Sequence, residues 1–297
     1  MTNTRAVVSS ESPLVTLFGI PRAFRGHVGM TQWNAVQSWA RLGRCEVVLC
    51  GDDDGVAAIA AEVNARHLSH IARNEFGTPF LDSALAAVDA VARAPMLAYV
   101  NADIILTQDF IEAVDAIPFG AFLMAGQRTN VSVSEHLVGT PGWERVIRDL
   151  ARQSGTLHPP HGSDYFVFPR GTFQSLPPFV VGRQGWDNWM FYDALRRRIP
   201  VVDCTNVVLA VHQNHDYSHV AGVQRGWPGP EGTRNHELAG GPEAMFGLME
   251  ATHELTAGGL RRRWTIRMLR GRLVSLKPWR AIRPMLRTVR RRLGSPL

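Results

Sequence analysis

Residues 97–106 read LAYVNADIIL, an apolar run interrupted at its centre by Asn101, Ala102 and Asp103. A carboxylate buried in such a run costs free energy unless a partner neutralises it. Asp103 could instead cap the helix expected from Thr107, but it lies four residues before that helix. Its position favours the other interpretation, a metal ligand at the carboxyl end of a buried strand.

Segments of strand-like and helix-like spacing alternate on both sides of this stretch. Strands are expected at 13–20, 45–50, 97–106, 121–126 and 164–169, with an extended segment at 200–215. Helices are expected at 31–43, 56–66, 81–94, 107–117, 143–152 and 186–198, with Gly43 as a C-cap and Thr107 as an N-cap. Continuous apolar strands alternating with helices are typical of a mostly parallel sheet covered on both faces. The pattern therefore predicts an α/β fold in which ligands bind outside the carboxyl ends of the strands.

The composition is that of a globular chain, with 45% hydrophobic residues among 297. Residues 1–12 are expected to be a flexible N-terminus and lack the pattern of a secretory signal. No apolar stretch approaches the ~18 residues that span a bilayer. Three cysteines without CxxC spacing indicate buried thiols in a reducing compartment, so we expect a cytoplasmic protein.

Charge is spread unevenly along the chain. Residues 258–297 hold twelve Arg, one Lys and no acid, whereas residues 13–257, the predicted globular domain, are net acidic. Apolar residues at helical spacing between Trp279 and Leu293 predict two short amphipathic helices. Such an Arg-rich segment is typical of peripheral binding to an anionic membrane, here at the inner face. A solvated tail, or one docked on the acidic body, is the alternative; nucleic acid is not expected, because no nucleic-acid fold accompanies the charge.

Several common catalytic motifs are absent from the sequence. Lys277 is the only lysine, which excludes a Walker A motif, and there is no GxGxxG, GxSxG or HExxH. Acidic and imidazole side chains remain at expected strand ends and loops: Asp52, Asp53, Asp54, Asp103, Asp164, Asp187, His212 and His215. Oxygen ligands with one imidazole suit Mg²⁺ or Mn²⁺, which complete their coordination with substrate phosphates. A nucleoside diphosphate is therefore the expected ligand.

The order of five short segments resembles that of glycosyltransferases with the GT-A (Rossmann-like) fold. These segments are LFGIPR (17–22), CGDDD (50–54), YVNADII (99–105), GWDNW (185–189) and VHQNHDYSH (211–219). The chain is similar to bacterial glycosyltransferases related to family 2, over roughly residues 13–220. The resemblance implies a mostly parallel central sheet with flanking helices, a nucleotide-sugar donor and a divalent metal ion.

The resemblance also assigns roles to individual residues. NAD at 101–103 corresponds to the DXD motif, so Asp103 and His212 would hold Mn²⁺ or Mg²⁺, with His215 as a reserve for His212. Contacts with the nucleotide sugar would come from Pro21, Arg22, Asp52, Asn74 and Asn101. Three simpler interpretations remain open: Asp103 as a helix cap, His212 as a core histidine, and GDDDG as a solvated turn whose acids favour the next helix N-terminus.

The loop GRQGWDNW contains the candidate catalytic residue. Asp187 lies between Trp186 and Trp189, and indole rings are good platforms for the apolar face of a sugar. In the resembling fold an acid at this place is the general base of inverting enzymes. Asp187 could instead be the helix N-cap or a hydrogen-bond partner of the acceptor. Asp164, Trp186 and Trp189 are the expected acceptor contacts.

Together these features predict a metal-dependent glycosyltransferase that moves a sugar from a nucleoside-diphosphate sugar to a hydroxyl of a glycan or lipid-linked acceptor. One alternative is a sugar-1-phosphate nucleotidyltransferase, which is disfavoured because GIPRAF (19–24) is too poor in glycine for its loop. The other is a non-catalytic nucleotide- or sugar-binding module at a membrane.

Overall fold

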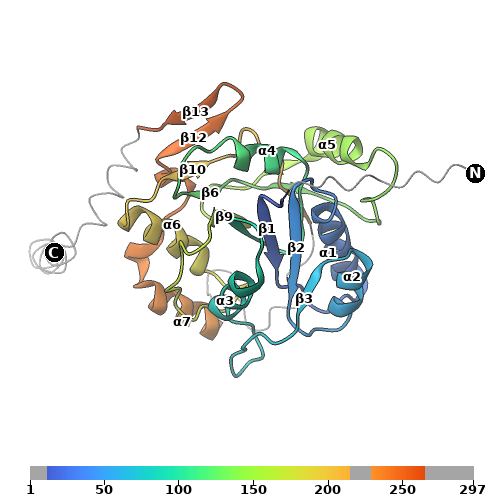
Figure 1. The fold of residues 1–297 in the computed structure, drawn as a ribbon, viewed down its shortest axis with the longest axis horizontal. Helices are drawn as coiled ribbons and strands as arrows, with labels where there is room; N and C mark the ends of the chain where they lie inside the picture. Colours follow the sequence, from blue (N-terminus) through green and yellow to red (C-terminus); the bar gives the residue numbers. More distant parts are fainter. Residues whose placement is uncertain (1–11, 215–228, 265–297) are drawn as a thin grey trace, which may run out of the picture.

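β4 (Met96–Val100) lies inside a nine-stranded sheet in the computed structural model, which describes residues 12–214 and 229–264 (Figure 1). Across the sheet the strands are β13 (Gly259–Arg262), β12 (His253–Thr256), β10 (Val201–Asp203), β6 (Leu123–Ala125), β9 (Tyr165–Pro169), β4, β1 (Val15–Gly19), β2 (Cys45–Cys50) and β3 (Arg66–Leu68). Neighbours are parallel except that β9 runs antiparallel to β4 and β6, and β13 to β12. The predicted α/β fold with a mostly parallel central sheet is confirmed.

Helices cover both faces of this sheet, which explains the continuous apolar character of its strands. The helices are α1 (Gly26–Trp39), α2 (Val56–Glu62), α3 (Leu81–Val91), α4 (Asp109–Asp115), α5 (Trp143–Ser154), α6 (Trp186–Arg196) and α7 (Gly229–Ala239). Successive residues of a strand point to opposite faces. Leu17 accordingly packs in the core that includes α1, α2 and α4, whereas Phe18 packs in the core that includes α3 and α6.

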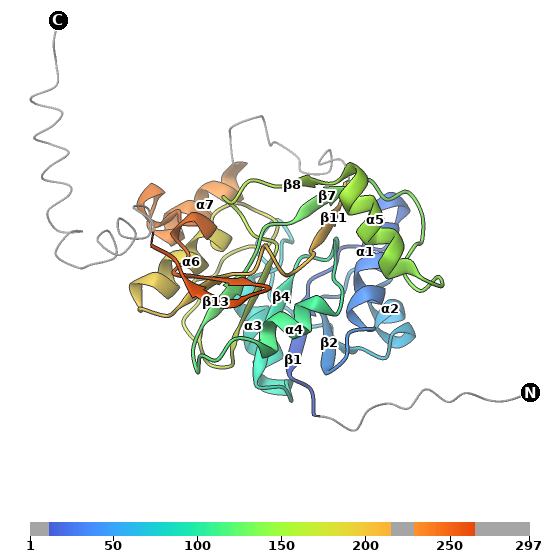
Figure 2. The same cartoon turned by 90° about the horizontal axis from the view of Figure 1, so that it is seen from above.

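A second, four-stranded sheet crosses the carboxyl ends of the large one. It consists of β5 (Ile104–Ile105), β11 (Val211–Gln213), β7 (Thr129–Val131) and β8 (Thr156–Leu157). Figure 2 shows α5 alongside this sheet. The expectation of one strand over 97–106 was wrong: the chain turns at residues 101–103, where the N–H of Ile104 donates to the carbonyl of Asn101. Asp103 therefore lies at the junction of the two sheets.

Two expected helix ends lie elsewhere in the structure. α1 begins five residues before Thr31 and its C-cap is Ala40, so Gly43 does not cap it. Gly43 instead donates its N–H to the side chain of Gln108, which is the N-cap of α4 in place of Thr107. The Thr107 hydroxyl donates to the side chain of Asp109, two residues further along. The α1 end is closed instead by backbone bonds from the N–H of Ala40 to the carbonyls of Val36 and Ser38.

The globular part of the chain extends beyond the boundary expected at residue 257. β13 pairs with β12 across a hairpin, and Arg263 forms an ion pair of 2.9 Å with Asp203 of β10. The boundary at 257/258 therefore falls within a hairpin of the large sheet. The amphipathic helices expected in the tail, the N-terminal residues 1–11 and His215 lie outside the described residues.

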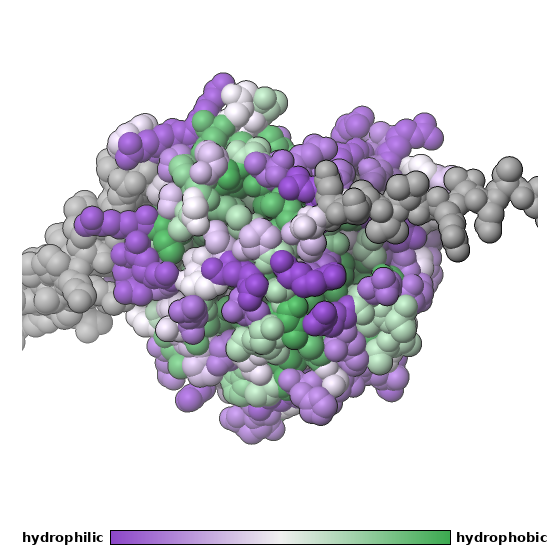
Figure 3. Space-filling view, in the orientation of Figure 1, coloured by the Kyte–Doolittle hydropathy of each residue, from purple (hydrophilic) through white to green (hydrophobic). Residues whose placement is uncertain are grey.

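On the face seen in Figure 3, hydrophilic and hydrophobic residues are interspersed. In the described part of the chain, no helix combines the length and apolar character needed to cross a membrane. The three cysteines are free thiols; Cys50 and Cys204 are buried as expected, whereas Cys45 is only partly buried.

Candidate active site

A cavity of about 710 Å³ opens at the carboxyl ends of β1 and β4, beside the loop that leads into α6. This volume lies within the range of small-molecule sites. Seven predicted site residues line it: Pro21, Arg22, Asn101, Asp103, Asp164, Trp186 and Asp187. The structure thus brings the NAD turn and the GWDNW loop, more than 80 residues apart in sequence, to one cavity.

Three other predicted residues have different positions. Asp52 is exposed and forms an ion pair of 2.7 Å with Arg73, while its neighbour Asp53 lines the cavity. Asn74 accepts the N–H groups of Phe76 and Thr78 and so stabilises its own turn. Trp189 is buried in the core, so the structure does not bring its indole to the cavity wall.

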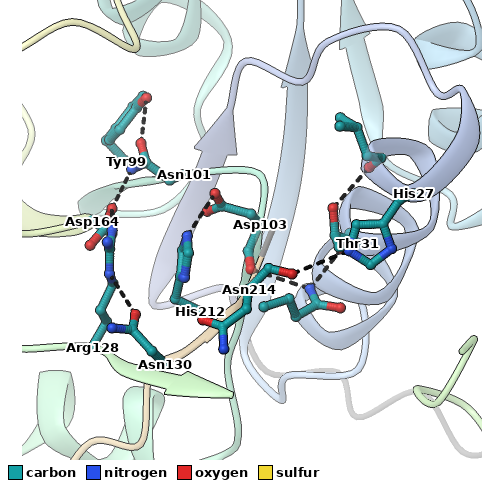
Figure 4. A network of polar contacts seen from close by, with 12 residues as sticks. His27, Thr31, Tyr99, Asn101, Asp103, Arg128, Asn130, Asp164, His212 and Asn214 are labelled. Carbon is teal, nitrogen blue, oxygen red and sulfur yellow. Dashed lines mark hydrogen bonds and ion pairs between the residues drawn. The ribbon is translucent and has the colours of Figure 1, made fainter. Parts of the chain in front are cut away.

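Asp103 and His212 face one another at the junction of the two sheets (Figure 4). The antiparallel register pairs His212 with Ile104, which places the imidazole beside the preceding residue, Asp103. His212 Nε2 lies 3.4 Å from Asp103 Oδ2, and the histidine is 3% exposed. Gln213 fixes the turn, because its side-chain amide donates to the carbonyl oxygens of Asp103 at 3.2 Å and Thr31 at 2.7 Å.

This pair is chemically suited to a divalent ion. Two ligand atoms bound at about 2.1 Å to one ion are separated by about 3–4 Å, which the Asp103–His212 distance satisfies. Within residues 12–214 and 229–264, no three His, Cys, Asp or Glu side chains form a candidate metal-binding group. An ion at Asp103 and His212 would thus take its other ligands from water or phosphate, as Mg²⁺ commonly does.

Asn101 has a role that the sequence did not reveal. Its side-chain nitrogen Nδ2 donates to Asp164 Oδ1 at 2.6 Å, and its side-chain oxygen Oδ1 accepts from the Tyr99 hydroxyl at 3.0 Å (Figure 4). Arg128 donates to the same Asp164 oxygen at 2.7 Å. An aspartate at 101 would place a second carboxylate against Asp164, which explains the asparagine at the first position of this motif.

Asp187 lies in the first turn of α6. The N-cap is Gly185, which has a φ of 106°, so Asp187 is not the cap. The N–H of Gly185 donates to Asp187 Oδ1 at 3.3 Å. Burial raises the pKa of Asp187 to about 6, backbone N–H groups oppose the shift, and the charge of Asp164 adds to it. A pKa near neutrality is suited to a general base.

Glycine at 162 leaves space beside Asp187. A Cβ at that position would lie 3.1 Å from Asp187 Oδ2. On the other side, Trp186 packs edge-on against Tyr99, with ring centroids 5.0 Å apart, and forms part of the cavity wall. A side chain at position 162 would therefore crowd the Asp187 carboxylate, which glycine leaves uncovered.

Arginines complete the cavity, and only Arg22 was predicted from the sequence. Arg73, Arg128 and Arg183 also line it. Arg128 follows a predicted strand by two residues, so its position at a strand end was a usable signal. Arg73 and Arg183 do not follow a predicted strand, so their sequence positions did not mark them as cavity residues. Their acidic partners, Asp52 and Asp53 for Arg73 and Glu231 for Arg183, lie in distant segments.

A scan against protein-family models finds no match to this chain, and a search of curated proteins finds none either. Solved structures of similar fold include glucosyl-3-phosphoglycerate synthase from Mycobacterium tuberculosis with Mg²⁺ and UDP, which is 16% identical over 77% of this chain and 80% of that chain, with a TM-score of 0.49. The same synthase with Mn²⁺, UDP-glucose and phosphoglyceric acid is 15% identical over 77% and 81%, with a TM-score of 0.48. At these identities the similarity concerns the fold, and the function has to follow from the residues of this chain.

Proposed function

We propose that this protein transfers a sugar from a nucleoside-diphosphate sugar to an acceptor hydroxyl with the help of Mn²⁺ or Mg²⁺. The observation that carries the proposal is the Asp103–His212 pair, 3.4 Å apart, beside a cavity that Asp187 also lines. A divalent ion held there would neutralise the charge that develops on the diphosphate as it leaves. Asp103 and the candidate base Asp187 line the same cavity, and His212 lies beside Asp103.

The donor would lie along the ends of β1 and β4. Pro21 and Arg22 line this part of the cavity, and the Arg22 guanidinium is the cation available to the diphosphate. Gln32 holds the Arg22 backbone, because its side chain accepts the N–H at 2.7 Å and donates to the carbonyl at 2.9 Å. The carboxylates after β2 would face the ribose or base, with Asp53 closer to the cavity than Asp52.

The acceptor would lie between Asp164 and Asp187. Its hydroxyl oxygen attacks the anomeric carbon of the sugar as the bond from that carbon to the diphosphate breaks, and its proton passes to the Asp187 carboxylate. Asp164 holds a neighbouring hydroxyl, because its carboxylate is fixed by Asn101 and Arg128. The acceptor would be a glycan or a lipid-linked sugar.

The cellular location belongs to the same proposal. We place the protein in the cytoplasm, with peripheral attachment to an anionic membrane through its basic C-terminal segment. At the end of the described chain, Trp264 is 64% exposed and the Arg262 guanidinium lies 4.1 Å from its ring centroid. An aromatic ring next to cationic side chains is favourable at a lipid headgroup surface.

Metal-dependent nucleotide binding tests the proposal directly. Solved structures of the similar synthase contain UDP-glucose and Mn²⁺, so this combination is the first to try. A nucleotide that binds the folded state raises the melting temperature by mass action, and the increase should require Mn²⁺. Transfer of labelled glucose would then establish catalysis, whereas binding without turnover of any nucleotide sugar would contradict it.

A further inference from the structure

We infer that the acceptor is an uncharged hydroxyl compound, such as a neutral sugar or polyol, and not a phosphorylated or carboxylated one. The inference rests on the proposed function and specifies its acceptor. It follows from the charges of the acceptor side of the cavity, the wall formed by Arg128, His158, Gly162, Ser163, Asp164, Arg183, Gln184, Trp186 and Asp187. Each arginine of this wall is already neutralised by an acid of the protein.

Arg128 is neutralised by Asp164. The guanidinium forms an ion pair of 2.7 Å with the carboxylate, and the two side chains are only 14% and 11% exposed. The Nε–H of Arg128 donates to Asn130 at 3.1 Å, which fixes the plane of the guanidinium. Because ion pairs shielded from water are weakly screened, an anionic acceptor would have to compete with Asp164 for this cation.

Arg183 is neutralised by Glu231 of α7. Two nitrogens of the guanidinium reach Glu231 Oε2, at 2.8 Å from Nε and 2.6 Å from Nη2. Glu231 is 11% exposed and also accepts from Asn74 at 2.7 Å, so it joins the two loops that flank the cavity. The pKa of Glu231 is lowered: burial opposes ionisation, but hydrogen bonds from Thr78, Asn74 and Arg183 outweigh it. The carboxylate is therefore charged at neutral pH and cancels the charge of Arg183.

His158 adds no positive charge at neutral pH. Its pKa is lowered, first by burial and then by the charge of Arg128. Counting only the described residues of this wall and their ion-pair partners, Asp187 makes the acceptor side net negative once it is ionised. Of the cavity arginines, Arg22 alone lacks an acidic partner within the described residues, and the donor diphosphate requires it.

Carboxylates without spare cations favour hydroxyl groups over anions. Within the described chain, both donors to Asp164 reach Oδ1, which leaves Oδ2 able to accept a hydroxyl from the ligand. A phosphate or carboxylate in the same place would lie beside two like charges, and such contacts cost several kcal/mol at an interface. The acceptor side is thus suited to a compound that donates hydrogen bonds and carries no charge.

The experiment measures binding and turnover in the full chain with Mn²⁺. Calorimetry first tests Mn²⁺-dependent binding of UDP, and the UDP complex is then titrated with phosphoglyceric acid. Turnover of UDP-glucose is compared for acceptor pairs that differ by one anionic group, methyl glucoside against methyl glucuronide and glycerol against glycerol phosphate. We expect the neutral member to be preferred at least about tenfold in kcat/KM, and phosphoglyceric acid to bind more weakly than about 10 mM.

The variant Glu231→Gln tests whether loss of an acidic partner creates anion binding on the acceptor side. It preserves the shape of the side chain and leaves the Arg183 charge uncompensated, so affinity for phosphoglyceric acid should rise at least about tenfold. Glu237→Gln, an exposed position on the same helix, is the matched control and should change nothing. If Glu231→Gln fails to fold, Asp164→Asn uncovers Arg128 and carries the same expectation.

Three results would overturn the inference: a wild-type preference for the anionic acceptors, a saturable phosphoglyceric acid site tighter than about 1 mM, or no gain of anion binding in the variants. If no acceptor in the panel is used, the titrations alone decide. Failure of the proposed function is a separate result, because it would show as absent Mn²⁺-dependent UDP binding in the first titration.

Discussion

Asn101 and Asp164 are joined twice: the backbone N–H of Asn101 donates to the Asp164 carbonyl at 2.8 Å, and its side-chain amide donates to Asp164 Oδ1 at 2.6 Å. The first bond ends the pairing of β4 with β9, where the chain leaves the large sheet. The second fixes a carboxylate at the cavity. The first residue of the NAD motif therefore positions an acid on a neighbouring strand end.

Asn101→Asp should destabilise the protein in a pH-dependent way. Two carboxylates at hydrogen-bond distance cannot both ionise easily, so one of the pair has a pKa raised above its unfolded value. The free energy of unfolding should therefore be lower by about 1–3 kcal/mol at neutral pH, above that pKa. The loss should decrease as pH falls, because the two carboxylates then share a proton. Thermal unfolding at several pH values measures this. Asn64→Asp, which adds the same charge at an exposed position, should show little effect, and equal losses in both variants would contradict the role of Asn101.

Asp103→Ala should abolish the Mn²⁺ dependence of UDP binding while the protein remains folded. Loss of the carboxylate removes the charged ligand, so affinity in the presence of Mn²⁺ should fall by well over tenfold. Calorimetry with and without the ion gives the result. Asp149→Ala on the exposed face of α5 serves as the control. Unchanged Mn²⁺ dependence in Asp103→Ala would leave the aspartate as a structural residue.

His212→Ala should behave as a weaker form of Asp103→Ala. If the imidazole binds the ion, higher Mn²⁺ concentrations should restore UDP affinity in part, because the carboxylate remains. The measurement is UDP affinity as a function of Mn²⁺ concentration. A histidine that only fills the core would instead give a lower melting temperature with a normal response to Mn²⁺.

Asp187→Asn should lower kcat by about 10² to 10⁴ with little change in donor affinity, because the carboxylate acts only on the acceptor proton. Asparagine keeps an oxygen for the N–H of Gly185.

Burial raises the pKa of Asp187 in the folded state to about 6. Ionisation of the folded protein therefore lowers the free energy of unfolding as pH rises from the unfolded pKa through 6. The asparagine variant should therefore be no less stable than wild type at neutral pH. Turnover near the wild-type rate would exclude Asp187 as the base.

The same pKa predicts the acidic limb of the pH profile. A base must be unprotonated, so kcat should fall as pH decreases through about 6. Initial rates at saturating donor and acceptor measure this, with pH-independent Mn²⁺ saturation as the control. A flat profile between pH values about one unit either side of 6 would indicate that Asp187 does not exchange the acceptor proton.

Removal of residues 265–297 should abolish binding to anionic vesicles and preserve Mn²⁺-dependent UDP binding. Each basic residue near an anionic surface contributes roughly 1 kcal/mol before screening, so binding of the full chain should also weaken steeply with salt. Sedimentation with vesicles measures both effects. The cut has to follow Trp264, because a cut after Gly258 would also remove β13 and the Arg263–Asp203 ion pair and lower the melting temperature. Full-length protein that ignores anionic vesicles at low salt would refute the membrane proposal.

The local pattern of the sequence was sufficient for the class of fold. Apolar runs such as 47–50 form strands because a strand buried on both faces needs no polar side chain, and that requirement is visible within four residues. The rule that ligands bind at the carboxyl ends of parallel strands then pointed to Asp103 correctly as a cavity residue. The β12–β13 hairpin was missed, since its Arg-rich second strand reads as part of a basic tail.

Tertiary structure decided which of the candidate side chains meet. Asn74 and Trp189 carry the right chemistry, but one stabilises its own turn and the other packs in the core. The Asp103–His212 contact depends on the register of β5 and β11, and the neutralisation of Arg183 depends on Glu231 from a helix 48 residues further along the chain. Sequence specifies the periodicity of each segment because that depends on neighbours along the chain. The charge and geometry of the cavity depend on pairings between distant segments, which form only when the sheets and helices pack together.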